Sequence, residues 1–213
     1  MSATLGAAKA FTYRSRSTVE VPTNTGQLIM LFATSDVTLA RPNKLRVHVT
    51  DEVLNFDFYE DGTTIAAFAP THQVYSVASA PPTIDATLTF VRDNTGIAFP
   101  SADVMYSDPY AVLTKDLTSA FVVGPATVEG VPCEPLACMG PEVHWEIWIE
   151  PGQRALPRRL VVTYTTVQNF PRFLVEFSDW NLQPKLGAIR FVFNTPRNAT
   201  QIEFVSPIGP KAQ

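Results

Sequence analysis

The sequence predicts a mainly β fold of the α+β class: a long antiparallel sheet that forms an incompletely closed β-barrel, with inserted helices covering its concave face. Apolar and polar residues alternate with period two over most of the 213 residues, and the period becomes helical only at about residues 83–115. A sheet of about a dozen strands must curl, because strand twist accumulates. No repeat or Gly/Ser linker divides the chain, so we expect a single domain, 1–213.

Six alternating runs occupy the first part of the chain. One of them places Leu45, Val47 and Val49 on one face of a strand and polar residues on the other. The EDG sequence at residues 60–62 is typical of a hairpin turn, since glycine readily adopts positive φ. The pattern predicts an antiparallel meander. Its runs are TYRSRSTVEV, QLIMLFATSDVTLA, KLRVHVTD, LNFDFYED, TTIAAFAP and QVYSVAS.

The period then changes to that of a helix. Ile84, Leu88 and Val91 follow the i, i+4, i+7 spacing of one helical face. Thr83 is a suitable N-cap after two prolines, and Gly96 is expected to end the helix. The helical insert therefore begins here.

A second helical piece is expected in PSADVMYSDPYAVLTK, with Ser101 as its N-cap and Pro109 starting a new turn or kinking the segment. Two interpretations of this piece stay open. It is a lid whose aromatic side chains touch a ligand, or Asp108 caps a turn while the tyrosines pack on the sheet. The lid or cavity-mouth residues would be Met105, Tyr106 and Tyr110.

Alternation returns after Thr118, in SAFVVG, ATVEGVPCEPLACM, VHWEIWIE, RRLVVTYTTV, RFLVEFSDWNL, AIRFVFN and IEFVSP. The inward faces of these strands and of the earlier meander supply candidate ligand-binding residues. They are Phe56, Phe58, Trp145, Ile147, Leu160, Val162, Tyr164, Phe173, Val175, Phe177, Phe191 and Phe193. Alternation alone does not distinguish a solid core from a cavity that would bind acyl chains through buried apolar area.

The stretch EVHWEIWIE, residues 142–150, concentrates potential chemistry. Period two places Trp145 and the neighbouring aliphatic residues on an apolar inner face, and His144 and Glu146 on a charged outer face. We expect the histidine and glutamates to be solvated, because a metal site needs three or four converging ligands. Trp148 shares the charged face, where it packs under an outer loop or marks a contact surface.

No motif in the sequence predicts a reaction. GxSxG is absent, and a carboxylate pair such as Glu146 with Glu176 is common on any sheet with alternating charge. We therefore expect no enzyme activity, no catalytic residue, no cofactor and no metal site. An enzyme that reuses the cavity for catalysis stays open as a third hypothesis, and three polar groups converging inside with shifted pKa values would be its mark. Cys133 and Cys138 could form a disulfide only across a turn at Glu134-Pro135, and this question stays open.

Bulk properties exclude some partners. The net charge of −4 argues against nucleic acid, which basic surfaces bind. No run of 18 apolar residues exists, so the chain is not expected to be an integral membrane protein. MSATLGAAKAF is too short for a signal peptide, and we expect a signal segment upstream of it.

Several stretches resemble the DUF2092 family of predicted periplasmic proteins, which is related to the LolA and LolB lipoprotein carriers. They are RPNKLRVHV, FYEDGTTIAAFAPTHQVYSVASAPPTID, TGIAFPSADVMYSDPYA, VEGVPCEPLA, VHWEIWIEPGQRALPRRLVVTY and FSDWNL. The resemblance implies a LolA-like fold, export to the periplasm and a longer N-terminal helix of which residues 1–11 are the end. Cys138 departs from the family pattern.

Together these observations predict a periplasmic binding or carrier protein for a lipid, a lipoprotein acyl group or another hydrophobic small molecule. The expected partner is that ligand, and a lipoprotein or an envelope protein is a further candidate. The alternative is a structural or protein-interaction module of the cell envelope.

Overall fold

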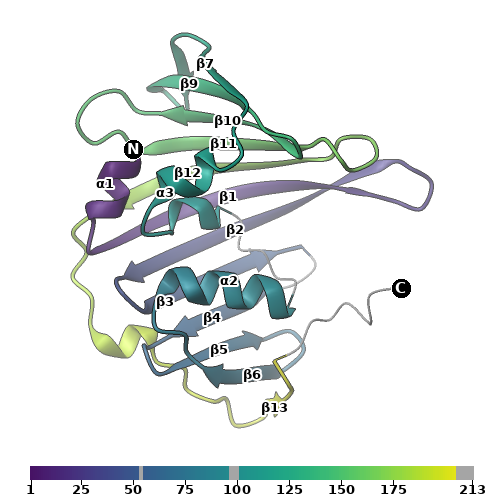
Figure 1. Cartoon of the computed structure of the whole chain (residues 1–213). Coiled ribbons are helices and arrows are strands. Elements are labelled where there is room, and N and C mark those ends of the chain that lie inside the picture. The colour runs from purple at the N-terminus through teal and green to yellow at the C-terminus, as the bar shows by residue number, and fades with distance from the viewer. Residues whose placement is uncertain (53–54, 96–100, 205–213) are drawn as a thin grey trace.

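The computed structural model of the chain describes residues 1–52, 55–95 and 101–204. Within them, thirteen strands form one sheet, in the order β13-β6-β5-β4-β3-β2-β1-β12-β11-β10-β9-β7, with β8 paired to β9 (Figure 1). The strands are β1 Ala10–Pro22, β2 Leu28–Ala40, β3 Lys44–Asp51, β4 Phe56–Glu60, β5 Thr64–Ala69, β6 Val74–Ser79, β7 Ser119–Val122, β8 Ala126–Val128, β9 Val131–Met139, β10 Val143–Ile149, β11 Pro157–Tyr164, β12 Arg172–Asn181 and β13 Thr200–Gln201.

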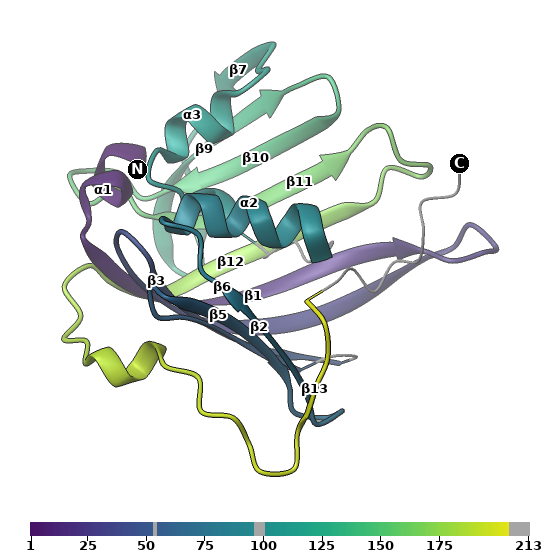
Figure 2. The same cartoon turned by 60° about the horizontal axis from the view of Figure 1, so that its bottom comes forward.

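The sheet is open and strongly curved. The strand order begins at β13 and ends at β7, two different edges, so the sheet does not close on itself. Figure 2 shows it bent around the helices, which lie on its concave side. Except for the short parallel pair β13 and β6, neighbouring strands are antiparallel. The predicted fold class is confirmed.

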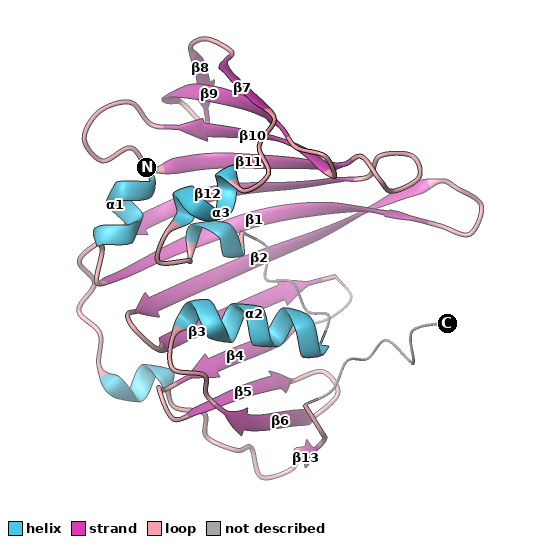
Figure 3. Ribbon diagram, in the orientation of Figure 1, coloured by secondary structure: helices cyan, strands magenta, loops and turns pink. Residues whose placement is uncertain are grey.

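Helices cover the concave face, here called the inner face (Figure 3). They are α1 Ser2–Ala7, α2 Ile84–Thr95, η1 Ala102–Val104 and α3 Pro109–Thr114; a further 3₁₀ turn, η2 Ala188–Phe191, lies elsewhere. The helical insert occurs where period 3.6 predicted it. No helix in the described part of the chain has the length and apolar character needed to cross a bilayer.

Two of the three helix N-caps predicted from the sequence occur in the structure. The Thr83 hydroxyl accepts a hydrogen bond from the Ala86 N–H, and Asp108 accepts one from Ala111 with Pro109 in the first turn of α3. Ser101 does not cap as expected. Its φ of 64° is left-handed and its side chain makes no capping bond, because its hydroxyl instead lies 3.3 Å from that of Tyr13.

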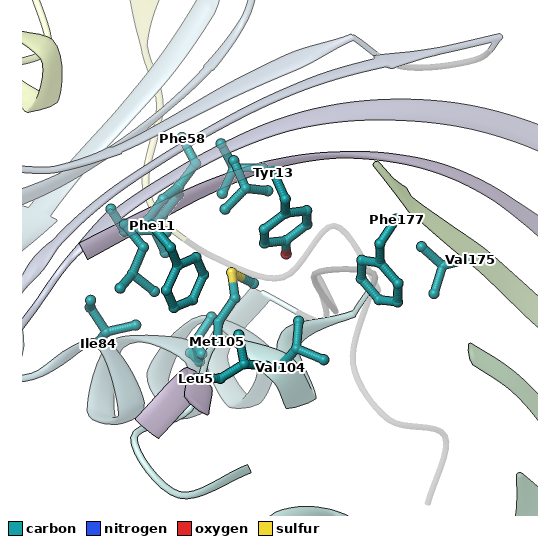
Figure 4. Close-up of a cluster of buried hydrophobic side chains, with 14 of the residues drawn as sticks. Leu5, Phe11, Tyr13, Phe58, Ile84, Val104, Met105, Val175 and Phe177 are labelled. Carbon is teal, nitrogen blue, oxygen red and sulfur yellow. The ribbon is translucent and has the colours of Figure 1, made fainter. Parts of the chain in front are cut away.

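The core lies between the helices and the inner face. Figure 4 shows Leu5 of α1, Ile84 of α2, and Val104 and Met105 of the η1 region meeting Phe11 and other side chains of the sheet. Aromatic residues from β1 and β12 add tilted ring contacts, with Tyr13 4.6 Å from Trp180 between centroids. These contacts anchor η1 and α1 against the centre of the sheet.

The segment AIRFVFN does not form the predicted inner strand. Residues 188–191 are η2, and Arg190 donates a hydrogen bond to the hydroxyl of Thr38, whose neighbours Val37 and Leu39 point to the inner core. The segment therefore runs along the outer face of the sheet, as Figure 2 shows. The prediction was wrong because apolar residues that pack on the outer face give the same sequence pattern as residues of an inner strand.

Candidate functional site

A cavity of about 540 Å³ lies between the inner face and the helices. Its floor is formed by β1, β2 and β10 to β12, and its roof by α2, η1 and α3. The volume falls within the range of small-molecule sites. It is lined by Ser17, Val19, Leu31, Phe32, Ala33, Asp51, Leu88, Arg92, Ser101, Ala102, Asp103, Tyr106, Val112, Leu113, Lys115, Val143, Trp145, Leu160, Val162, Tyr164 and Phe173.

Five of the residues expected to bind ligand meet in this cavity. Trp145, Leu160, Val162, Tyr164 and Phe173 come from β10, β11 and β12. Register explains their proximity, because Val162 lies opposite Trp145 on one side and Phe173 on the other. Side chains directly opposite one another in an antiparallel pair share a face and touch.

The other expected residues lie elsewhere. Phe58, Ile147, Val175 and Phe177 are buried in the core, and Phe56 packs against it. Phe191 is in η2 and outside that core. Phe193 packs on the outer face against Tyr59, Phe68 and Tyr75, with ring centroids 5.5 to 6.1 Å apart. Placing Phe191 and Phe193 in the cavity was wrong.

The expected lid is formed differently from the prediction. Tyr106 lines the cavity, and its carbonyl oxygen accepts a hydrogen bond of 2.8 Å from Arg41, which holds the η1–α3 connection near the sheet. Met105 is fully buried in the core and Tyr110 is 65% exposed, away from the cavity. Only one of the three residues is therefore placed to touch a ligand.

Sequence reasoning missed the β1–β2 side of the cavity. Val19 and Leu31, which lie opposite each other on β1 and β2, line it, and Val19 is also 37% exposed at its rim. The unbroken apolar run LIMLF at residues 28–32 was the available signal, since a strand with one solvated face does not carry such a run. The mouth of the cavity is consequently apolar.

A few polar groups interrupt the apolar lining. Ser101 lines the cavity, and its hydroxyl oxygen lies 3.3 Å from that of Tyr13; both residues are buried. Asp103, on η1, is half-buried, and desolvation raises the pKa of its carboxyl. The Asp103 charge in turn raises the pKa values of Tyr13 and Tyr164, although burial is the larger cause for both.

Two basic residues line the cavity at exposed positions. Arg92, near the end of α2, pairs with Asp93 at 2.9 Å, and Lys115 follows α3. Both side chains remain hydrated, which weakens their effect on charges inside the cavity. The interior therefore combines apolar walls with two half-buried carboxyl groups, those of Asp51 and Asp103.

The charged face of β10 lies on the outer side of the sheet, as its alternation indicates. His144 and Glu146 are exposed. Trp148 is half-buried beneath the guanidinium of Arg159, which lies 5.3 Å from its ring centroid and also pairs with Glu176. Trp148 therefore packs within the outer face and is not a free contact surface.

The described residues contain no group of three His, Cys, Asp or Glu side chains arranged to hold a metal ion. Cys133 and Cys138 are free thiols, both buried in β9. The strand continues through Glu134-Pro135 without the required turn. In the strand register Cys133 lies opposite Ala126 of β8, and Cys138 lies opposite Trp145 of β10. The structure contradicts the disulfide.

Comparisons with known proteins agree with this fold. The model of a family described as "Predicted periplasmic protein (DUF2092)" matches residues 1–205. The structure is similar to that of an uncharacterized conserved protein from Thermus thermophilus, with 7% identity, TM-score 0.53 and coverage of 93% of this chain and 92% of the other. No curated protein shows significant similarity to the sequence.

Two further solved structures resemble this one. The Mycobacterium tuberculosis lipoprotein LppX is 12% identical over 87% of this chain and 93% of its own, with TM-score 0.51. A LolA superfamily protein, NE2245 from Nitrosomonas europaea, gives a TM-score of 0.43 at 12% identity, covering 90% of this chain and 96% of its own. At these identities the likeness to LppX shows the fold alone.

Proposed function

The chain belongs to the DUF2092 family of predicted periplasmic proteins, and we propose that it binds and carries a hydrophobic ligand in the inner-face cavity. The ligand would be a lipid, the acyl group of a lipoprotein or another apolar small molecule, and the site of action the periplasm. The cavity of about 540 Å³ is the observation that carries the proposal. A curved sheet whose helices filled its concave side completely would have none.

Burial of apolar surface supplies the affinity. Each methylene group that leaves water contributes about 0.8 kcal/mol. Trp145, Val162 and Phe173 offer a wide apolar wall, and Leu88 of α2 faces them across the cavity. Such a wall binds by shape and area, which suits a carrier that must also release its ligand.

Entry and release would occur at the apolar rim. Val19 is exposed there and, with Leu31 opposite it, also lines the cavity, so a chain that slides inwards meets apolar surface. Tyr106, held through its carbonyl oxygen by Arg41, closes part of the roof. The proposal includes no catalytic step.

A homologous series of alcohols tests the proposal. A neutral fluorescent probe, N-phenyl-1-naphthylamine, is bound to the protein and displaced by linear alkanols of increasing length. Affinity should rise about fourfold per methylene and then level off when the cavity is full. Absence of both probe binding and displacement would refute the carrier function.

A second function, an interaction module of the cell envelope, is favoured by the edge strand β7. Phe121, Val122 and Val123 are 59 to 64% exposed, and among the described residues β7 pairs with β9 alone. An exposed apolar edge can accept an extended segment of another protein. Failure of the alkanol series, together with loss of an in-cell cross-link to an envelope protein in Val122→Lys, would support this function.

A further inference from the structure

Two carboxyl groups line the cavity, those of Asp51 and Asp103, and among the described residues that of Asp103 forms no ion pair. Asp103 lines the cavity from η1, whose neighbouring residues Val104 and Met105 are fully buried and fix the turn in place. In the described part of the chain no side chain donates a hydrogen bond to its carboxyl group, and burial raises the pKa of that group. A carboxylate so placed loses hydration without gaining a partner, which is costly unless a ligand supplies one.

The surroundings of Asp103 do not supply that partner. Its charge acts on the hydroxyls of Tyr13 and Tyr164, on the facing strands β1 and β11. Tyr13 is already 3.3 Å from Ser101. Arg92 and Lys115 line the same cavity, but both are exposed; Arg92 pairs with Asp93, and among the described residues neither forms an ion pair with Asp103.

We infer that Asp103 makes the cavity selective for amphiphiles whose polar end donates a hydrogen bond or carries a positive charge, over those that end in a carboxylate. The inference rests on the proposed function and specifies its ligand class. A long-chain alcohol or amine would place its hydroxyl or ammonium against Asp103 and its chain along Trp145 and Val162. A fatty-acid carboxylate would bring a like charge to a desolvated site, which electrostatic repulsion disfavours.

Three ligands with the same chain separate these cases. Dodecanol, dodecylamine and dodecanoate each displace N-phenyl-1-naphthylamine from the protein at pH 7.5. We expect the alcohol and the amine to bind at least about tenfold more tightly than the carboxylate, the effect of one hydrogen bond to a charged group. In Asp103→Asn the amide keeps the shape without the charge, and the difference should fall below about threefold.

The matched control is Asp36→Asn, the same chemical change on the outer face, where Asp36 pairs with Arg14 at 2.9 Å. It should leave the ligand order unchanged. Near-ultraviolet circular dichroism of both variants shows whether they fold like the unaltered protein. If Asp103→Asn does not fold, Asp103→Ser is measured in the same way.

The pH dependence gives a second readout. Ionisation of Asp103 attracts the ammonium and repels the carboxylate, so the preference for dodecylamine over dodecanoate should increase as the pH rises through the pKa of Asp103, which burial raises. The increase should be smaller in Asp103→Asn, which retains the other titratable residues of the cavity, Asp51 and Tyr106 among them.

The outcomes distinguish this inference from the proposal on which it rests. Equal binding of the three ligands, or a preference for dodecanoate, overturns the role of Asp103 and leaves the carrier function standing. A preference that persists in Asp103→Asn also overturns it. Failure of all three ligands to displace the probe refutes the carrier function itself.

Discussion

The hydroxyl of Thr87 in α2 donates a hydrogen bond of 2.8 Å to Oε1 of Glu60 at the end of β4, and both side chains are fully buried. The second carboxyl oxygen of Glu60 has no partner among the residues that the structure describes. This bond joins α2, which roofs the cavity through Leu88, to the sheet beneath it. A buried carboxyl with one donor is stable as the neutral acid and unstable as the anion.

Stability should therefore fall as the pH rises. Burial raises the pKa of Glu60 from 4.5 to about 7, so the folded state holds a proton that the unfolded state has released. Between these pH values unfolding releases a proton, and the free energy of unfolding decreases with increasing pH. The total loss is on the order of 3 kcal/mol, measurable by urea denaturation between pH 4.5 and pH 8.5.

Glu60→Gln tests whether Glu60 causes this decrease in the free energy of unfolding with increasing pH. Glutamine keeps an oxygen that can accept the Thr87 bond and has no charge to bury, so most of the decrease should disappear. Glu134→Gln, at an exposed position in β9, should retain it. If the free energy of unfolding decreased equally with pH in the unaltered protein and in Glu60→Gln, Glu60 would not be the cause of the decrease.

Gly6 allows close packing of α1 against the backbone at Ser107, just before α3. A Cβ at this position would lie 2.8 Å from the carbonyl oxygen of Ser107, a backbone atom that cannot rotate away. Gly6→Ala should therefore destabilise the protein by about 1–3 kcal/mol, despite the higher helix propensity of alanine.

Gly187→Ala is the matched control for Gly6→Ala. A Cβ added to Gly187 would meet no atom within 4 Å, and its φ of −83° suits any residue. The free energy of unfolding, measured in urea, should change by less than about 0.5 kcal/mol. A neutral or stabilising Gly6→Ala would show that α1 does not pack as described.

The two cysteines should behave as inert thiols. Burial raises the pKa values of Cys133 and Cys138, and the thiolate is the reactive form. The folded protein should react slowly with a chromogenic disulfide reagent. After unfolding without a reductant, both cysteines should react, and the reagent should release two equivalents of its coloured thiolate per chain. Release of no thiol after unfolding would mean that a disulfide exists.

Alternation was sufficient to predict the strands and their faces where only one face is buried. In β10 it placed Trp145 inwards and His144 and Glu146 outwards, as the structure has them. It failed for Phe191 and Phe193, because the chain after β12 buries apolar residues on the outer face. Period two identifies which side of a strand is buried. It does not say whether the helices on the inner face or the chain segment on the outer face bury that side.

The cavity could be predicted only in part. Ile147 and Val162 belong to the inner faces of neighbouring strands, yet Ile147 is core and Val162 lines the cavity. The difference depends on where α1, η1 and α3 pack, and that is decided by tertiary contacts such as the one between Arg41 and Tyr106. Asp103 was missed for the same reason, since one aspartate in a helical run carries no local signal.

Probe binding by two tryptophan variants of β11 tests the carrier function most directly. Val162 lies between Trp145 and Phe173 on the inner face, whereas Val161 lies opposite Glu146 and Leu174 on the outer face. Val162→Trp should fill the cavity and weaken binding of N-phenyl-1-naphthylamine at least about tenfold, while Val161→Trp should bind like the unaltered protein. Undiminished binding by a folded Val162→Trp would contradict the proposal that this cavity holds the ligand.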